Sequence, residues 1–444
     1  MSQPKYLVAV VGAGPAGLYA AKQLTSDSTH VVLFNRDIKP AGLAEYGIYP
    51  SKHKMKEGLR KQYRGILASP VVEYYGNVTI GAQGDLSLDD LRALGFHAIL
   101  VTVGAQGTKS LGLPGENLTG VYHAKDVVYH YNQLPPFSQK EFAFGRKVAI
   151  VGVGNVMLDV ARYCVRTLKV DEVVAVARRG PAEVKFDKEE LEYVAQNLDL
   201  AALDAELERA RPIMEAVGQD AQAAKEKYFL SALPKAQAKI SETRFRFDFL
   251  ASPTAMVGDA EGRMIGLEVE DNTLIAAEGD TKAKGLGTKR VIGVDTVVFA
   301  IGDVVDVTFG LPTKWNAFVK NPAPRFPVDG LSYEAFDPEA NKPIADVFVA
   351  GWSREASTGL VGAARKDGIN GANAILQYLQ TLPPVETFNL DLVRQKMASL
   401  EKPVITKEDW QKLEKIEQVE AQQRGLEEFK FGTNEEMLKV MGLD

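Results

Sequence analysis

"VVGAGPAGLYAA" (Val10–Ala21) is the stretch that decides the fold of this chain. It overlaps the end of a β-branched run, Tyr6–Val11, and continues into a helical pattern. Gly12, Gly14 and Gly17 have the G-x-G-x-x-G spacing. In this spacing the first glycine makes a tight turn, the second lets a pyrophosphate approach the backbone and the third lets the helix pack closely. The stretch therefore predicts a strand, a turn and a helix that open a parallel sheet and bind a dinucleotide at the helix N-terminus.

The next predicted strand, "HVVLFN" (His30–Asn35), ends where a ribose contact is expected. An acidic residue usually stands at this position, about 20 residues after the turn, to accept a hydrogen bond from a ribose hydroxyl. Asn35 offers a carbonyl oxygen, which accepts the same bond more weakly than a carboxylate does. We interpret Asn35 as the ribose contact, and an asparagine that merely ends the strand is the alternative.

A second glycine-rich turn, "VGVGNVMLDVAR" (Val151–Arg162), repeats the first one later in the chain. Gly152 and Gly154 keep the first two positions of the spacing. The strand that follows ends in Arg178 and Arg179, and two guanidinium groups there suit a 2′-phosphate. The second turn therefore predicts NADP rather than NAD, with a pair of merely solvated arginines as the alternative.

The third position of the second turn holds Met157, where glycine or alanine is usual. A long side chain at the contact between helix and strand should displace the helix unless the flexible methionine bends into a gap. Our hypothesis is that the turn keeps its function while its helix lies slightly displaced. Two dinucleotide turns in one chain indicate a permanent flavin and a mobile nicotinamide, with electrons passing between them.

Composition narrows the class of protein further. The chain has 444 residues and a net charge of -6, so it is long enough for about three domains or two large ones, and nucleic acid is not expected as a partner. Its one cysteine, Cys164, excludes an intramolecular disulfide, a redox-active cysteine pair and an iron–sulfur cluster held by this chain alone. No apolar run reaches the roughly 20 residues of a membrane helix, and no metal site is predicted. We therefore expect a cytoplasmic protein.

The remaining sequence alternates predicted strands and helices. Further strands are predicted at His97–Ala105, Lys147–Gly152, Glu172–Gly180, Phe245–Leu250, Met264–Asp271, Val294–Asp303 and Ile344–Trp352. After Val385 the chain is polar with a helical pattern, and "TKEDW" (Thr406–Trp410) predicts the start of a helix there.

The chain resembles the adrenodoxin reductase type of ferredoxin–NADP reductase, within the wider flavoproteins that include the glutamate synthase small subunit. The resemblance rests, besides the two turns, on "GLAEYGIYPS", "YYGNVTIG", "LGLPGENLTGV", "ARRGPAEVKFDKEEL", "VFVAGWSREASTGLVGAARKDG" and "KPVITKEDW". It implies an α/β fold with two Rossmann-like dinucleotide-binding domains, the NADP domain being inserted into the FAD domain. The implied FAD domain is residues 1–108 and 336–384, the NADP domain residues 109–335, and residues 385–444 form a C-terminal helical extension.

The resemblance also implies which residues meet the cofactors. Besides Gly12, Gly14 and Gly17 of the first turn, FAD contacts are implied at Ala16, Asn35, Leu43, Val78, Trp352, Gly359, Leu360 and Val361. NADP contacts are implied at Val153, Gly154, Asn155, Val156, Arg178, Arg179, Glu190 and Gly359.

Several positions depart from the family pattern. The family usually has Glu at Asn35 and a small residue at Met157, and its "PDHP" segment reads Pro50–His53 here. Its "KRGPTG" segment reads Arg354–Gly359, so the Ser353–Ser357 loop lacks the usual proline and part of the positive charge. These departures are expected to affect cofactor affinity and redox tuning.

The implied activity is hydride exchange between NADPH and FAD, with single electrons passed to or from a ferredoxin-like iron–sulfur protein. We nominate no catalytic side chain, because hydride transfer needs no acid–base pair. The alternatives are an NADPH-oxidising electron-input subunit of a larger complex and a non-catalytic NADP-binding flavoprotein, and both a monomer and a homodimer remain open.

Because ferredoxins are commonly acidic, two basic groups are candidate docking faces, with solvated surfaces as the alternative. They are Lys225, Lys227, Lys235, Lys239, Arg244 and Arg246, and Lys52, Lys54, Lys56, Arg60, Lys61 and Arg64.

Overall fold

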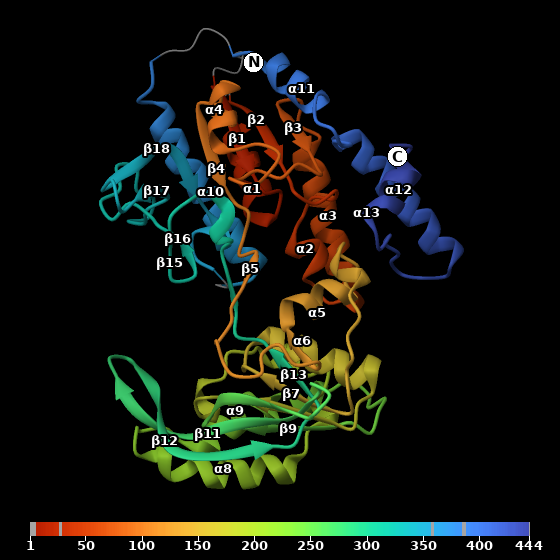
Figure 1. Ribbon diagram of the computed structural model, residues 1–444, viewed down its shortest axis with the longest axis vertical. Helices are drawn as coiled ribbons and strands as arrows, with labels where there is room; N and C mark the ends of the chain where they lie inside the picture. The colour runs from red at the N-terminus through yellow and green to blue at the C-terminus, as the bar shows by residue number, and fades with distance from the viewer. Residues whose placement is uncertain (1–5, 26–28, 357–358, 384–387, 444) are drawn as a thin grey trace. The chain divides into compact units, whose positions relative to one another are not determined.

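The computed structural model of the chain divides into two compact units (Figure 1). It describes residues 6–25, 29–356, 359–383 and 388–443. The first unit comprises Met1–Lys109, Tyr129–Gln139 and Gly302–Asp444, and the second comprises Ser110–Val128 and Lys140–Ile301. The chain therefore enters the second unit from the first and returns to it.

The first unit is built on a six-stranded sheet with the order β17-β18-β4-β1-β2-β3. Neighbouring strands are parallel except for the antiparallel pair β17 and β18. Its strands are β1 (Tyr6–Val11), β2 (Thr29–Phe34), β3 (Val72–Tyr75), β4 (Ala98–Val101), β17 (Glu334–Asp337) and β18 (Lys342–Val349). Two small antiparallel pairs accompany it: β5 (Gly107–Thr108) with β14 (Asp303–Val304), and β15 (Thr313–Lys314) with β16 (Ala317–Phe318).

Helices cover both faces of this sheet, which explains why β1 is apolar at nearly every position. Val8 and Val10 belong to one core with Trp410 and Met437, whereas Ala9 on the opposite face belongs to another core. The helices of the unit are α1 (Pro15–Thr25), α2 (Leu43–Tyr46), α3 (His53–Leu67), α4 (Leu88–Ala93), α10 (Val361–Leu379), α11 (Leu390–Ala398), α12 (Lys407–Gln423) and α13 (Asn434–Met441). A further helix, α5 (Ala124–Tyr131), contains the boundary between the units. Among the residues described, no helix combines the length and the apolar composition that crossing a membrane would need.

The second unit contains a five-stranded parallel sheet with the order β6-β13-β7-β8-β9. Its strands are β6 (Val121–His123), β7 (Lys147–Val151), β8 (Glu172–Val176), β9 (Arg244–Asp248) and β13 (Thr296–Phe299). A separate antiparallel sheet consists of β10 (Ala251–Gly258), β11 (Met264–Ala277) and β12 (Asp280–Ile292). The helices are α6 (Asn155–Arg162), which continues as a π-helical turn at Tyr163–Leu168, α7 (Lys188–Leu191), α8 (Leu200–Glu215) and α9 (Ala221–Tyr228).

These elements confirm the predicted α/β class. Each glycine-rich turn joins a strand of its unit's sheet to the helix that follows it. The helix predicted at "TKEDW" is confirmed as well: Thr406 caps α12, and its side chain and that of Asp409 form a reciprocal capping box. Met264–Asp271 is a strand as predicted, but it belongs to the separate antiparallel sheet.

The bounds of the two units differ from the domain bounds implied by the resemblance. Residues 302–335 belong to the first unit, because β14 pairs with β5 and the N–H of Asn321 donates to the carbonyl of Glu334. Residues 129–139 belong to the first unit too. The C-terminal residues after 384 are part of the same unit, since α12 and α13 contribute to its core.

Cys164 lies in the π-helical turn after α6 and is fully buried, and burial raises the pKa of its thiol to about 12. Because the thiolate is the reactive form, we expect no labelling of the native protein by a thiol reagent at pH 8. The measurement is the absorbance of released thionitrobenzoate, with the guanidinium-unfolded protein as the positive control. Rapid labelling of the native chain would contradict this burial.

Candidate functional site

The first glycine-rich turn has the close contacts that its spacing predicts. A Cβ added to Gly17 would lie 1.9 Å from the carbonyl oxygen of Gly12, so only glycine lets α1 approach the turn this closely. Gly12 itself has a φ of +103°, and an added Cβ would lie 2.6 Å from the carbonyl oxygen of Thr102. Gly14 differs, because no atom lies within 4 Å of a Cβ placed there. This open position beside the start of α1 fits the pyrophosphate of a dinucleotide.

Asn35 holds this turn from the end of β2. Its Oδ1 accepts a hydrogen bond from the N–H of Ala13 at 3.0 Å, and its Nδ2 donates to the carbonyls of Asp37 at 2.8 Å and Lys39 at 3.0 Å. A glutamate carboxylate cannot donate these two bonds, and this explains structurally why asparagine stands at this position. Oδ1 keeps a second lone pair for a ribose hydroxyl, so the predicted ribose contact stays compatible with the geometry.

Other residues implied for FAD lie around the same turn. The N–H of buried Val78 donates to the carbonyl of Asn35 at 2.9 Å, and the N–H of Ala41 donates to the carbonyl of Ala13 at 2.7 Å. Leu43 begins α2 directly after Gly42, and a Cβ added to Gly42 would lie 3.2 Å from the Cα of Gly14. The structure therefore brings the segments that carry Asn35, Leu43 and Val78 together at the phosphate turn.

A third segment reaches α1 from the C-terminal part of the sheet. Trp352 is half-buried in a short turn after β18, and a Cβ added to neighbouring Gly351 would lie 2.7 Å from the Cβ of Ala16. Gly359 has a φ of +72°, and Leu360 caps α10 without a side-chain hydrogen bond and is 67% exposed. The N-terminus of α10 is therefore accessible. Its first N–H groups, from Val361 onward, have no partner within the helix and favour a negatively charged group nearby.

The Ser353–Ser357 loop is anchored at its start. The guanidinium of Arg354 is paired with Asp367 of α10 at 2.7 Å, and Ser353 accepts a hydrogen bond from the N–H of Gly104. Arg354 is therefore held by α10, and its charge is balanced there. Residues 357 and 358 of the loop lie outside the described residues.

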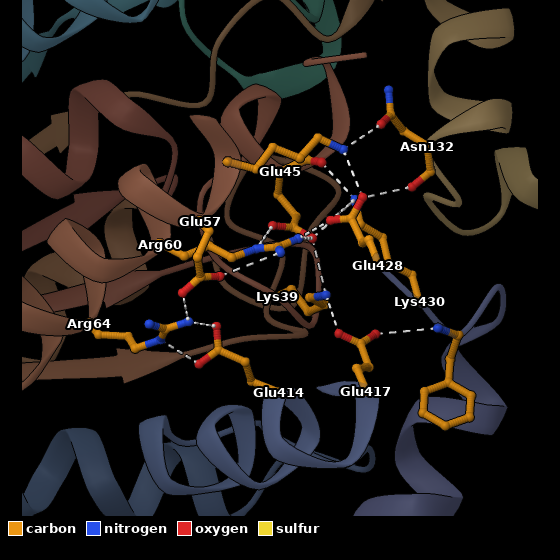
Figure 2. Close-up of polar contacts among 12 residues, drawn as sticks. Lys39, Glu45, Glu57, Arg60, Arg64, Asn132, Glu414, Glu417, Glu428 and Lys430 are labelled. Carbon is orange, nitrogen blue, oxygen red and sulfur yellow. Dashed lines mark hydrogen bonds and ion pairs between the residues drawn. The ribbon is translucent and has the colours of Figure 1, made fainter. Parts of the chain in front are cut away.

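An ionic cluster includes Glu45 of α2, and we define it as Lys39, Glu45, Lys56, Arg60, Glu417, Glu428 and Lys430. Figure 2 labels all of its members except Lys56. The carboxylate of Glu45 pairs with Lys39 at 3.2 Å, Lys430 at 3.0 Å and Arg60 at 2.7 Å. Burial alone would raise the pKa of Glu45, but these three cations hold it well below its usual range. Glu45 is therefore the central anion of the ionic cluster.

The C-terminal segment supplies three members of the ionic cluster, as Figure 2 shows. Glu417 of α12 pairs with Lys39, and Glu428 pairs with Arg60 and, at 3.2 Å, with Lys56. Burial lowers the pKa of Lys56 to about 7, with Lys430 adding to the shift. Because the carbonyl of Lys39 accepts the hydrogen bond from Asn35, the C-terminal segment supports the loop beside the first turn.

The ionic cluster also corrects one of the two candidate docking faces. Lys56, Arg60 and Arg64 belong to one candidate docking face, but the first two lie in the ionic cluster and Arg64 pairs with Glu414 of α12 at 2.8 Å. In the other group, Lys225, Lys239, Arg244 and Arg246 pair with Asp or Glu residues of their own unit. Three of the six cations in the group that contains Arg64 and four of the six in the other group are thus paired with acids of the chain.

The second glycine-rich turn repeats the geometry of the first. A Cβ added to Gly152 would lie 2.3 Å from the carbonyl oxygen of Ala300, whereas Gly154, at the start of α6, has no atom within 4 Å of such a Cβ. Val156 follows with 44% exposure, and the carbonyl of Val153 accepts a hydrogen bond from the N–H of Lys185. The open position at Gly154 again fits a pyrophosphate.

Asn155 uses both ends of its side-chain amide within the protein. Its Nδ2 donates to the carboxylate of Asp187 at 2.8 Å, and its Oδ1 accepts from the N–H of Asp187 at 2.8 Å. Glu190 lies half-buried in α7 just beyond, and its N–H donates to the carbonyl of Asp187. Asn155 and Glu190 are therefore both bonded to Asp187.

Met157 is fully buried in the first turn of α6, and its N–H donates to the carbonyl of Gly154 at 3.1 Å. We expect Met157→Ala to lower the free energy of unfolding by about 2–5 kcal/mol, because it leaves a cavity under the helix. We also expect a changed affinity for NADP+, since the helix can then move toward β7. Urea unfolding and nucleotide titration measure both effects, with Leu200→Ala, 40% exposed at the start of α8, as the control. Unchanged stability and affinity would refute the hypothesis that Met157 displaces the helix.

The two arginines after β8 differ in their exposure and in their contacts. Arg178 is exposed, whereas Nη1 of Arg179 pairs with Asp280 at the start of β12 at 2.9 Å and donates to the carbonyl of Thr281 at 3.1 Å. Arg178 thus matches the predicted phosphate contact more closely than Arg179 does. Sequence reasoning missed Asp280, which lies about a hundred residues further along the chain.

Comparisons with known proteins agree with this arrangement. The family model described as pyridine nucleotide-disulphide oxidoreductase matches residues 6–209. NADPH-ferredoxin reductase FprA of Mycobacterium leprae is 26% identical, with 98% of this chain and 98% of that protein covered. The mitochondrial NADPH:adrenodoxin oxidoreductase of Homo sapiens is 27% identical, with 98% and 92% covered. The structure of Mycobacterium tuberculosis FprA in complex with NADPH matches with a TM-score of 0.81 and 25% identity, covering 98% of this chain and 99% of that one.

Among the described residues, no group of three or more His, Cys, Asp or Glu side chains is placed to hold a metal ion. The arrangement consists of two open glycine-rich turns, one on the mixed sheet of the first unit and one on the parallel sheet of the second. The comparisons agree with the resemblance seen in the sequence: over nearly its whole length the chain is similar to proteins named NADPH-ferredoxin reductase and NADPH:adrenodoxin oxidoreductase.

Proposed function

We propose that the chain is an oxidoreductase that exchanges hydride between NADPH and FAD and passes single electrons to or from a ferredoxin-like iron–sulfur protein. Its cofactors are FAD and NADP(H). The observation that carries the proposal is the pair of glycine-rich turns, each with its second glycine, Gly14 or Gly154, open beside a helix start. The names of the relatives, NADPH-ferredoxin reductase and NADPH:adrenodoxin oxidoreductase, support the same reaction and partner.

The residues of the chain bind and orient the two cofactors. In the first unit, the N–H groups after Gly14 would hold the FAD pyrophosphate, and Asn35 would meet a ribose hydroxyl. The exposed start of α10 at Leu360 and Val361 would direct N–H groups at the flavin ring, where negative charge grows on reduction. In the second unit, Gly154 and Arg178 would hold the pyrophosphate and 2′-phosphate of NADP(H). Bound flavin supplies the change from two-electron to one-electron transfer.

The proposed partner and location rest on different observations. A ferredoxin-type iron–sulfur protein is the expected electron carrier because the chain has a single buried cysteine and so holds no cluster by itself. The same cysteine count fits a reducing compartment, and we propose the cytoplasm.

Anaerobic mixing tests the first half of the reaction. The purified protein should be yellow, and NADPH should bleach its flavin absorbance much faster than NADH does. A colourless protein, or one that NADPH does not bleach, would contradict the proposal. A yellow protein that binds NADP+ without being reduced would instead identify a non-catalytic flavoprotein.

A further inference from the structure

The β11–β12 hairpin is fastened to the turn that carries Arg178 and Arg179. Nδ2 of Asn272 in β11 donates to the carbonyl of Arg178 at 2.8 Å. Asp280 at the start of β12 accepts from Arg179 at 2.9 Å, and the carbonyl of Thr281 accepts from the same guanidinium. The end of the hairpin is therefore a wall of the site that the 2′-position of the nucleotide would occupy.

A second acid lies beneath this turn. Glu183 is 7% exposed, and its Oε1 accepts hydrogen bonds from Thr281 Oγ1 at 2.5 Å and from Gln219 Nε2 at 2.7 Å. Its Oε2 is buried without a hydrogen-bond partner among the described residues and lies 3.0 Å from the position of a Cβ at Gly180. A second carboxyl group thus lies close to the turn that carries Arg178 and Arg179.

Arg179 is already paired with an acid before any nucleotide binds. Its partner is Asp280, which Lys185 also influences. The pKa of Asp280 is lowered, first by the N–H of Thr281 and then by Arg179, with a further contribution from Lys185. Arg179 therefore already has a carboxylate partner where a phosphate would bind.

We propose that Asp280 is a specificity-determining residue, which competes with the 2′-phosphate of NADP(H) for Arg179 and so limits the preference for NADP(H) over NAD(H). This inference rests on the proposed function, because it takes the second unit as the nicotinamide nucleotide site. A bound 2′-phosphate displaces the Asp280 carboxylate from Arg179, and Arg178, for which no salt bridge is found among the described residues, provides the second charge. An unphosphorylated nucleotide leaves the Arg179–Asp280 pair intact.

Titration of the FAD-loaded protein with NADP+ and with NAD+ tests this competition. Asp280→Asn should bind NADP+ about three- to tenfold more tightly, because the exposed pair is weak and its loss frees Arg179 for a dianion. The affinity for NAD+ should stay within about twofold. The control is Asp259→Asn, which removes a comparable pair with Arg263 in the same unit and should change neither affinity.

A double variant shows whether the effect passes through Arg179. In the Arg179→Ala background, Asp280→Asn should no longer tighten NADP+ binding. An unchanged ratio of NADP+ to NAD+ affinity in Asp280→Asn, or an equal gain without Arg179, would overturn the inference while leaving the proposed function in place. A wild-type protein that binds neither nucleotide would overturn the proposed function and the inference together.

Discussion

Replacing Glu45 by alanine is expected to lower the free energy of unfolding by about 3–5 kcal/mol, because it leaves buried cations without their shared partner. Glu45 is 2% exposed and pairs with Lys39, Arg60 and Lys430. Urea unfolding followed by circular dichroism measures the loss. The matched control is Glu414→Ala, which breaks the more exposed pair with Arg64 and should cost no more than about 1 kcal/mol. Equal losses in the two variants would contradict the central place of Glu45 in the ionic cluster.

The same variant is expected to lose bound FAD. Lys39 is held by Glu45 and Glu417, and its carbonyl accepts the hydrogen bond from Asn35 next to the first turn. Without Glu45, Lys39 keeps its pair with Glu417 but loses the other one, so the segment after Asn35 should move and the ratio of FAD to protein absorbance should fall. Glu417→Ala should act in the same direction, because it removes the partner that α12 supplies to Lys39. Full retention of FAD in both variants would show that the ionic cluster stabilises the fold but does not contribute to FAD binding.

Gly17→Ala is the second substitution with a large expected effect. The added Cβ would lie 1.9 Å from the carbonyl oxygen of Gly12, and backbone cannot yield at that distance without opening the turn. We expect a colourless protein with a lowered midpoint of thermal unfolding, measured by flavin absorbance and calorimetry.

Substitutions of two other glycines distinguish an effect on stability from an effect on FAD binding. Gly14→Ala meets no atom within 4 Å, so the protein should keep its stability without cofactor but bind FAD more weakly. Gly58→Ala, in the exposed part of α3, also has open space and should be neutral or slightly stabilising. A yellow, stable Gly17→Ala protein would contradict the close packing of α1 on the turn.

The sequence predicts the parts of this molecule that depend on neighbours along the chain. The strand, turn and helix around Gly12 are local, and so is the capping box at Thr406. Each has a fixed spacing of residue types that one fold satisfies. The resemblance adds the segments around Leu43, Val78 and Trp352, and the structure brings the first two to the turn that carries Gly14.

What the sequence does not predict depends on residues far apart in the chain. Lys39 and Glu417 are separated by 378 positions, and no local pattern pairs them. The basic run from Lys52 to Arg64 has the composition of a docking face, yet helix α12 and the segment after it turn several of its members inward. The pairing of Arg179 with Asp280 also escaped prediction, because β12 is polar and largely exposed and carries no apolar alternation.

The most direct test of the proposed electron transfer is NADPH-driven reduction of a plant-type or adrenodoxin-type [2Fe–2S] ferredoxin by the purified protein without oxygen. We expect the ferredoxin absorbance to bleach at a rate proportional to the concentration of the protein. With Arg178→Ala, the reaction should require a higher NADPH concentration, and with Gly17→Ala it should not proceed. Flavin that NADPH reduces while neither ferredoxin accepts electrons would contradict the proposed function.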